Sequence, residues 1–323
     1  MPSRHDPQPQ FEDARLSAAH RAALRSLDRV VEHTAEPTEP SLAREAVLEQ
    51  LLAGNVLLLT GAGISTDSGI PDYRGPQGSL RRSRPMTYQE FQADPEARQR
   101  YWARGFVGTR LMGQARPNIS HHIVADWQRR GLLSGIVTQN VDGLHAAAGA
   151  TDVVALHGDM RSVICLDCGN AEPRASFERR LEEANPGYRE SVNVKLTALD
   201  VNADGDVSLD AETVARFHTV TCLVCGSDRL KPSVVYFGEN VPAPTRERAE
   251  ELKAASTSLL VVGSSLAVMS GYRFVLDAQK RGQHVSVING GPGRADARVE
   301  TLWRTQAAPA LEELDAALRR AGR

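Results

Sequence analysis

Short apolar runs alternate with helical segments from about residue 40 to the end of the chain. The segment 41–54 has helical spacing, ends at a glycine and leads into the apolar run 55–60. Near-continuous apolar strands between helices are typical of a parallel sheet covered on both faces. The pattern therefore predicts an α/β fold. The further runs, all short and bounded by Gly, Asn, Ser or Pro, are 133–138, 152–156, 233–237, 258–263 and 284–289.

Two stretches depart from this alternation. Residues 84–117 have a mainly helical pattern, and residues 161–230 carry a polar insert. We expect these insertions to form a smaller lobe beside a sheet core at about 39–83, 118–160 and 231–323. The N-terminal extension, 1–38, combines a Pro/Gln-rich start, an amphipathic helix over roughly 12–33 and a proline-bearing linker. The expected division is therefore an extension at 1–38 and one two-lobed domain at 39–323.

Charge and composition narrow the classes of partner. The 323-residue chain has a formal net charge of −2, so no strong field favours nucleic acid or an acidic membrane surface. No apolar run approaches the roughly 18 residues of a membrane span. The first residues lack the apolar core of a signal peptide, and we expect a cytoplasmic protein. The sequence does not indicate an oligomeric state.

The four cysteines form two Cys-x-x-Cys pairs, Cys165 with Cys168 and Cys222 with Cys225. In a chain of this kind the pattern favours metal ligation over disulfides. Two such pairs supply all four ligands of a closed structural zinc site. The long spacer between them contains DVNADGDVSLD, at 200–210, which has acids at alternate positions like a calcium loop. Because Ala211 stands where that loop needs a glutamate, a solvated turn is the favoured interpretation.

A glycine-rich turn follows the first apolar run. Gly61 and Gly63 have the spacing of a nucleotide-binding turn, in which glycines permit tight turning and close approach to a pyrophosphate. Thr66 replaces the usual third glycine and no ribose-binding acid follows, so the dehydrogenase fingerprint fails. A purely structural turn is the alternative. The Gly/Pro-rich loop after this turn carries Asp72, Tyr73 and Arg74. Binding and catalytic residues commonly lie on loops of this kind.

Polar residues also follow the next two apolar runs. Gln139, Asn140 and Asp142 come after the run 133–138, and His157 comes after the run 152–156. In open α/β sheets the carboxyl ends of strands line the ligand crevice. The alternatives are a helix cap at Asn140 or Asp142 and a hydrogen-bonded structural histidine.

Three later strand ends extend this set. The stretch 231–242 is an aromatic-rich strand that accepts an extended peptide by strand addition or, alternatively, lies in the core. The stretches 261–268 and 286–294 are strand-end loops suited to a ribose or phosphate.

The order of these motifs closely resembles the sirtuin family. GAGIS, GIPDYRG, TQNVDGLH, LHG, two Cys-x-x-Cys pairs, KPSVVYFGE, GSSL and ING occur in turn over about residues 40–320. The finer pattern, with CLDCG, FGENVP and MSGYRF, resembles the sirtuin 4-like branch of class II. The resemblance implies a Rossmann-like parallel-sheet domain, a smaller zinc-binding lobe and NAD consumed as a substrate.

The implied function is NAD-dependent protein-lysine deacylation. The acyl oxygen attacks ribose C1′ as nicotinamide leaves, and free lysine and O-acyl-ADP-ribose form. His157 matches the general base that takes a proton from a ribose hydroxyl, and Asn140 joins it as a catalytic residue. The substrate peptide is expected on Val235, Phe237, Gly238 and Glu239. The positions matched to NAD binding are Gly61, Ala62, Gly63, Asp72, Tyr73, Arg74, Gln139, Asn140, Asp142, Gly263, Ser264, Ser265, Asn289, Gly290 and Ala307.

One helical pair bears on the acyl group. Tyr101 and Arg104 share a helix face, and the resemblance places that face over the acyl pocket. An arginine pairs bidentately with a carboxylate, which predicts a preference for dicarboxylic acyl-lysine. The alternative is a solvated face on which Arg98, Arg100 and Arg104 are simply exposed. The alternatives to deacylation are mono-ADP-ribosyl transfer to protein, nicotinamide-linked oxidoreduction and non-catalytic NAD sensing.

Overall fold

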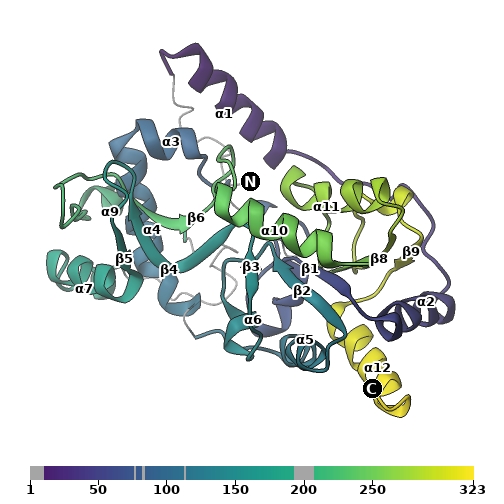
Figure 1. Cartoon of the computed structure of the whole chain (residues 1–323). Helices are drawn as coiled ribbons and strands as arrows, with labels where there is room; N and C mark the ends of the chain where they lie inside the picture. Colours follow the sequence, from purple (N-terminus) through teal and green to yellow (C-terminus); the bar gives the residue numbers. More distant parts are fainter. Residues whose placement is uncertain (1–10, 76–77, 82–83, 113, 193–206) are drawn as a thin grey trace. The chain divides into compact units, whose positions relative to one another are not determined.

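The chain folds into two compact units, which are described separately (Figure 1). The computed structural model describes residues 11–75, 78–81, 84–112, 114–192 and 207–323. The large unit comprises Arg29–Gly75, Arg116–His157 and Val241–Arg323, and the small unit comprises Met1–Asp28, Pro76–Ala115 and Gly158–Asn240.

A parallel sheet forms the centre of the large unit. Within the described residues it has six strands in the order β3-β2-β1-β7-β8-β9, and every neighbouring pair is parallel. The chain runs from β1 outward to β3 and then resumes on the other side of β1 at β7, so the topological switch point lies between β1 and β7. The parallel sheet predicted from the apolar runs is confirmed. The strands are β1 (Val56–Thr60), β2 (Leu133–Thr138), β3 (Val153–Ala155), β7 (Ser258–Val262), β8 (His284–Ile288) and β9 (Thr301–Trp303).

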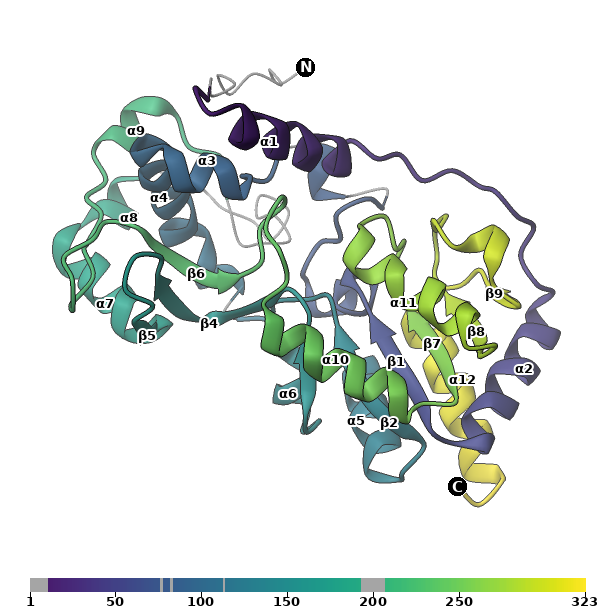
Figure 2. The same cartoon turned by 45° about the horizontal axis from the view of Figure 1, so that its top comes forward.

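Helices cover both faces of this sheet, as Figure 2 shows. Successive side chains of β1 alternate between the faces: Leu58 packs with α2, α5 and α12, while Leu57 and Leu59 pack with α10 and α11. Burial on both faces explains why most of the strand positions are apolar. The helices are α2 (Pro40–Ala53), α5 (Ile119–Arg129), α6 (Leu144–Ala147), α10 (Ala243–Ala255), α11 (Met269–Lys280) and α12 (Ala307–Arg320), with short 3₁₀ turns η1 (Ala62–Ile64), η2 (Thr66–Ser68) and η5 (Asp296–Arg298).

The small unit contains an antiparallel sheet of order β5-β4-β6 in its described part. The prediction that the run 233–237 joins the parallel sheet is wrong: β6 pairs antiparallel with β4. Hydrophobicity alone does not reveal which sheet a short apolar strand joins. The elements are α1 (Ala14–Leu27), η3 (Ser79–Arg81), α3 (Tyr88–Ala93), α4 (Pro95–Met112), β4 (Gly158–Cys165), β5 (Ala171–Pro173), α7 (Arg174–Ala184), α8 (Tyr188–Ser191), α9 (Ala211–Ala215) and β6 (Leu230–Val234).

Aromatic side chains fill the core of the small unit. Trp102 is buried, and its indole N–H donates to the carbonyl of Leu230 at 2.9 Å. Phe177 lies against its ring, with centroids 4.5 Å apart. Helix α4 is thereby fixed to the start of β6, the strand that leads to the predicted peptide segment.

The structure bears on three further expectations, for the N-terminal helix, the calcium-like stretch and membrane-spanning segments. The N-terminal helix ends at Leu27, earlier than the predicted residue 33, because the β-branched Val30 and Val31 disfavour helix and Val30 is exposed. Most of the calcium-like stretch, 200–206, lies outside the described residues, and Asp210 caps α9 by accepting from the Thr213 N–H at 2.7 Å. Among helices in the described ranges, none has the length and apolar character to cross a bilayer.

Candidate functional site

Two backbone loops press together at the switch point of the large unit. The N–H of Gly63 donates to the carbonyl of Gly263 at 2.8 Å. A Cβ on Gly61 would lie 2.7 Å from the Cβ of Ser264, and one on Gly63 would lie 2.9 Å from the Cα of Gly263. Gly263 has φ +64°, a left-handed conformation that favours glycine. The glycines are therefore required for contact between these two loops, a reason that the nucleotide-turn spacing alone does not reveal.

A hydrogen-bonded network orders the polar residues after β2. The buried Ser65 hydroxyl donates to Asp142 Oδ2 at 2.7 Å and accepts from Asn140 Nδ2 at 3.0 Å. Asn140 Nδ2 also donates to the carbonyl of Gly61 at 3.1 Å. Asp142 Oδ1 additionally accepts from the Leu144 N–H at 2.9 Å, where the chain enters the next helix. The structure thus brings together the strand ends of β1 and β2, as predicted.

Two buried histidines, His121 and His145, adjoin this network. His121 lies 3.4 Å from the Ser65 hydroxyl through Nε2, and His145 Nε2 lies 2.9 Å from the Thr60 hydroxyl. Their rings pack edge to face, with centroids 5.0 Å apart. Burial lowers the pKa of His121 to about 4, against the opposing effect of the Asp142 carboxylate. Burial also lowers the pKa of His145 to about 3, so both rings are neutral at pH 7.

His157 follows β3 and is half-buried, with both ring nitrogens engaged. Its Nδ1 donates to the backbone carbonyl of Gln139 at 2.9 Å, since a carbonyl only accepts. In the neutral ring Nε2 therefore carries the lone pair, and it accepts from the Ser270 hydroxyl at 2.8 Å. Burial lowers the pKa of His157 to about 4, although the Gln139 carbonyl favours the charged form. The ring is held as a neutral base with one defined accepting atom.

The other predicted NAD positions lie on loops of the same unit. Gln139 Nε2 donates to the Ser264 hydroxyl at 2.7 Å, which links the ends of β2 and β7. Asp72 accepts from the N–H of Gly75 at 2.9 Å and so shapes the loop that carries Tyr73 and Arg74. The remaining positions are Ala62 in η1, Ser265 after β7, Asn289 and Gly290 after β8, and Ala307 at the start of α12.

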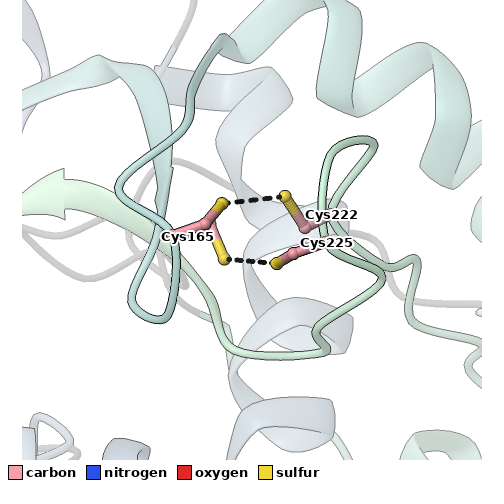
Figure 3. A group of neighbouring side chains, drawn as sticks. Cys165, Cys222 and Cys225 are labelled. Carbon is pink, nitrogen blue, oxygen red and sulfur yellow. Dashed lines mark hydrogen bonds between the residues drawn. The ribbon is translucent and has the colours of Figure 1, made fainter.

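The four cysteines of the small unit gather at two matching turns. Cys165 is the last residue of β4, and Cys168 follows it in the turn. Cys222 and Cys225 lie in the turn before β6. Each turn ends in a glycine in the left-handed region, Gly169 with φ +72° and Gly226 with φ +74°. Figure 3 shows the labelled sulfurs of Cys165, Cys222 and Cys225 pointing toward one another.

The sulfur positions fit a tetrahedral zinc ion. All four Sγ atoms lie within 4.8 Å of one another, with 3.6 Å between Cys165 and Cys225 and 3.7 Å between Cys168 and Cys222. Zn–S bonds of about 2.3 Å in a tetrahedron require S–S separations of about 3.8 Å. Disulfides need about 2.05 Å, and all four thiols are free. Four thiolates leave no open coordination position, so a zinc ion here would be structural.

The predicted substrate residues lie in the small unit. Glu239 Oε2 accepts from the N–H of Tyr236 at 2.9 Å and from the buried Lys231 ammonium at 3.1 Å, which closes the turn after β6. Tyr101 is buried, and its ring lies 5.5 Å from that of Tyr236. Val235, Phe237 and Gly238 complete the segment.

Helix α4, which carries Tyr101, does not present Arg98, Arg100 and Arg104 on an exposed face, as the alternative interpretation expected. Arg98 is buried, not exposed, and its guanidinium pairs with Asp228 at 2.6 Å. Arg104 is half-buried one turn beyond Tyr101. The spacing of residues along the helix does not indicate that Asp228, which is far away in the sequence, pairs with Arg98.

Sequence reasoning did not identify several residues that orient the site. Ser65 and Ser270 each hydrogen-bond to a predicted site residue, Asp142 and His157 respectively, and His121 lies against Ser65. Ser65 lies within the glycine-rich turn, so its proximity offered a local indication. The other two carried none, because their contacts join segments far apart in the sequence.

A parallel sheet with a glycine-rich turn and polar groups at its switch point is typical of nucleotide-binding α/β proteins. Residues 61–270 match the model of the Sir2 family. The chain is 55% identical to NAD-dependent protein deacetylase 1 of Corynebacterium efficiens, an alignment covering 85% of this chain and 98% of that relative. It is 53% identical to the protein of that name from Streptomyces coelicolor, over 82% and 86% of the two chains. The chain therefore belongs to the Sir2 family, and it is an enzyme of the sirtuin class.

Solved structures agree with this assignment. One described as "Structural Basis for the Mechanism and Regulation of Sir2 Enzymes" matches with TM-score 0.68 and 28% identity, over 88% of this chain and all (100%) of that one. Another, "Sir2-p53 peptide-NAD+", matches with TM-score 0.65 and 26% identity, over 86% and 98% of the two chains.

Proposed function

We propose that this protein is an NAD-dependent protein-lysine deacylase. The observation that carries the proposal is His157, whose Nε2 lone pair stands at the carboxyl end of β3 beside the polar ends of the neighbouring strands. The relatives named as deacetylases support it. In the overall reaction acyl-lysine, NAD and water give lysine, nicotinamide and O-acyl-ADP-ribose.

The proposed chemistry starts with loss of nicotinamide. The C1′–N bond to nicotinamide breaks as the acyl oxygen bonds to C1′. His157 Nε2 then takes the proton of a ribose hydroxyl, and that oxygen attacks the acyl carbon; water completes release of the lysine amine. Nδ1 keeps its proton throughout because the Gln139 carbonyl accepts from it. The pKa near 4 leaves the base unprotonated at neutral pH before substrate binds.

The remaining residues position the substrate in this proposal. Asn140 and Asp142, fixed by Ser65, face the nicotinamide and ribose, and the loop 263–265 with Asn289 holds the adenosine side. A zinc ion on the four cysteines would cross-link the two cysteine turns of the small unit and would take no part in the catalytic steps.

Product analysis tests the proposal. The purified protein is incubated with NAD and acyl-lysine peptides, and the products are identified by mass spectrometry. Free lysine peptide together with O-acyl-ADP-ribose supports deacylation. Mono-ADP-ribosylated protein without deacylated peptide would instead support the transferase alternative, which the names of the relatives do not favour.

A pair of variants tests the assigned base. His157→Tyr removes the accepting nitrogen and is expected to lower kcat by at least about 100-fold, the scale of a lost general base, with zinc content unchanged. Ser270→Ala removes only the hydroxyl that donates to Nε2, so turnover is expected within about threefold of wild type. Full activity of His157→Tyr would contradict the base assignment.

The acyl preference is a finer part of the proposal. We take the enzyme to prefer dicarboxylic acyl-lysine and to belong to the sirtuin 4-like branch of class II. Tyr101 supports this because its ring packs on Tyr236 in the predicted peptide segment, with Arg104 one helical turn away. A guanidinium at that position offers two parallel bonds to a carboxylate.

Comparison of acyl groups tests this preference. kcat/KM on glutaryl-lysine peptide is expected to exceed that on acetyl-lysine peptide, and Arg104→Leu to reverse the order. Arg100→Leu, also half-buried on α4, is the matched control and is expected to keep it. Faster acetyl cleavage that Arg104→Leu leaves unchanged would contradict the preference while leaving deacylation intact.

A further inference from the structure

The N-terminal helix α1 packs within the small unit through one stripe of side chains. Its buried residues are His20, Ala23 and Leu27, whose spacing places them on a single helix face. Asp13 caps the helix, accepting from the Arg15 N–H at 2.7 Å. Figure 2 shows α1 lying alongside α3. The helix is thus a packed element of this unit.

Helix α1 contacts the start of α3, and α3 in turn contacts the predicted peptide segment, residues 235–239. His20 Nδ1 donates to the hydroxyl of Thr87 at 3.0 Å, and that hydroxyl donates to Glu90 Oε2 at 2.9 Å. Thr87 is fully buried at the start of α3. The next backbone N–H, of Tyr88, donates to the carbonyl of Phe237 at 2.9 Å. Helix α1 therefore supports the short backbone link that fixes Phe237.

The second contact is direct. Gly238 has φ +84°, and a Cβ there would lie 2.9 Å from the Cβ of Ala23 and 2.4 Å from Gln89 Oε1. Gln89 Nε2 donates to the Gly238 carbonyl at 3.0 Å. The turn is held between α3 on one side and α1 on the other. Ala23 lies so close that a larger side chain has no room unless helix or turn moves.

We infer that α1 is a positioning element for the acyl-lysine peptide. The inference rests on the proposed function, because it takes residues 235–239 as the segment to which the peptide adds. In the described part of the small unit β6 is the outer strand, which suits strand addition. A segment held in shape before the peptide arrives spares the peptide the cost of ordering it. Loss of the α1 contact therefore weakens peptide binding and leaves the NAD chemistry unchanged.

Two neighbouring alanines give a matched test in the full-length protein. Ala23→Glu places a charged side chain against Gly238, whereas Ala22→Glu makes the same change on the exposed side of the same helix. Ala23→Glu is expected to raise the peptide KM by about tenfold, with kcat, the NAD KM and zinc content within about twofold of wild type. Ala22→Glu is expected to match wild type. Ala23→Ser, which keeps a small side chain, is expected to restore most of the peptide affinity.

A second variant distinguishes loss of the α1 contact from a general loss of structure. His20→Ala removes the bond to Thr87 without adding charge, and the peptide KM is expected to rise there too. An unchanged peptide KM in both variants, with an active wild type, would overturn the inference and leave the proposed function standing. Parallel losses of kcat, NAD affinity and zinc would also overturn it. A wild-type protein that deacylates no peptide would overturn the proposed function itself.

Discussion

Mild acid is expected to destabilise the large unit through its two buried histidines. The pKa of His121 is lowered to about 4 and that of His145 to about 3, whereas an unfolded histidine titrates near about 6.5. Between these values the unfolded chain binds more protons than the native one. Stability is therefore fully present above pH 6.5 and is lost as the pH falls toward 4.

The expected magnitude follows from this linkage. For one histidine whose pKa moves from about 6.5 to about 4, lowering the pH from 7.5 to 5.5 costs about 1.3 kcal/mol of unfolding free energy. His145, which is still more strongly shifted, adds about the same amount, so the pair together contributes about 2.7 kcal/mol.

Urea denaturation at several pH values measures this effect. His121→Gln removes one of the two groups, and the loss between pH 7.5 and 5.5 is expected to shrink by about 1.3 kcal/mol. His122→Gln is the matched control, because that ring is exposed on the same helix. An equal pH dependence in wild type and His121→Gln, with unchanged m-values, would refute the reasoning.

Three further changes and one control substitution probe the other parts of the structure. Cys168→Ser removes one of four zinc ligands and is expected to abolish stoichiometric zinc, measured by elemental analysis; retained zinc would contradict the assigned site. Gly63→Ala forces a Cβ against Gly263 and is expected to cost about 1–3 kcal/mol in urea unfolding and to raise the NAD KM. Gly105→Ala is the control for an added Cβ and is expected to cost nothing, because a Cβ built there meets open space. Lys231→Met leaves the Glu239 carboxylate without its buried partner and is expected to cost about 3 kcal/mol; unchanged stability would show that the pair is dispensable.

Local sequence patterns determined much of the large unit. The runs at β1, β2, β3, β7 and β8 are recognisable because strands buried on both faces are apolar at most positions. β9 was not predicted, because its residues Thr301–Trp303 lie between Glu300 and Arg304 and form no apolar run. The cysteine pairs were likewise recognisable from spacing alone, because each knuckle is formed within five residues of chain.

The partners of the site residues were decided by the tertiary structure. The sequence placed His157 after a strand and left open whether it was structural. Its accepting nitrogen and lowered pKa follow from the Gln139 carbonyl, the Ser270 hydroxyl and burial, which come together only in the fold. The sheet that β6 joins was decided in the same way.

The sequence by itself thus determined five of the large unit's strands, the order of polar strand ends and a four-cysteine cluster, because each depends on neighbours along the chain. Only the tertiary structure showed that Gly61 and Gly63 are needed for contact with the loop at Gly263, and that Ala23 of the extension lies against Gly238. Hydrogen bonds, desolvation and close packing between distant segments leave no periodic trace in the sequence, since they depend on which surfaces the fold brings together.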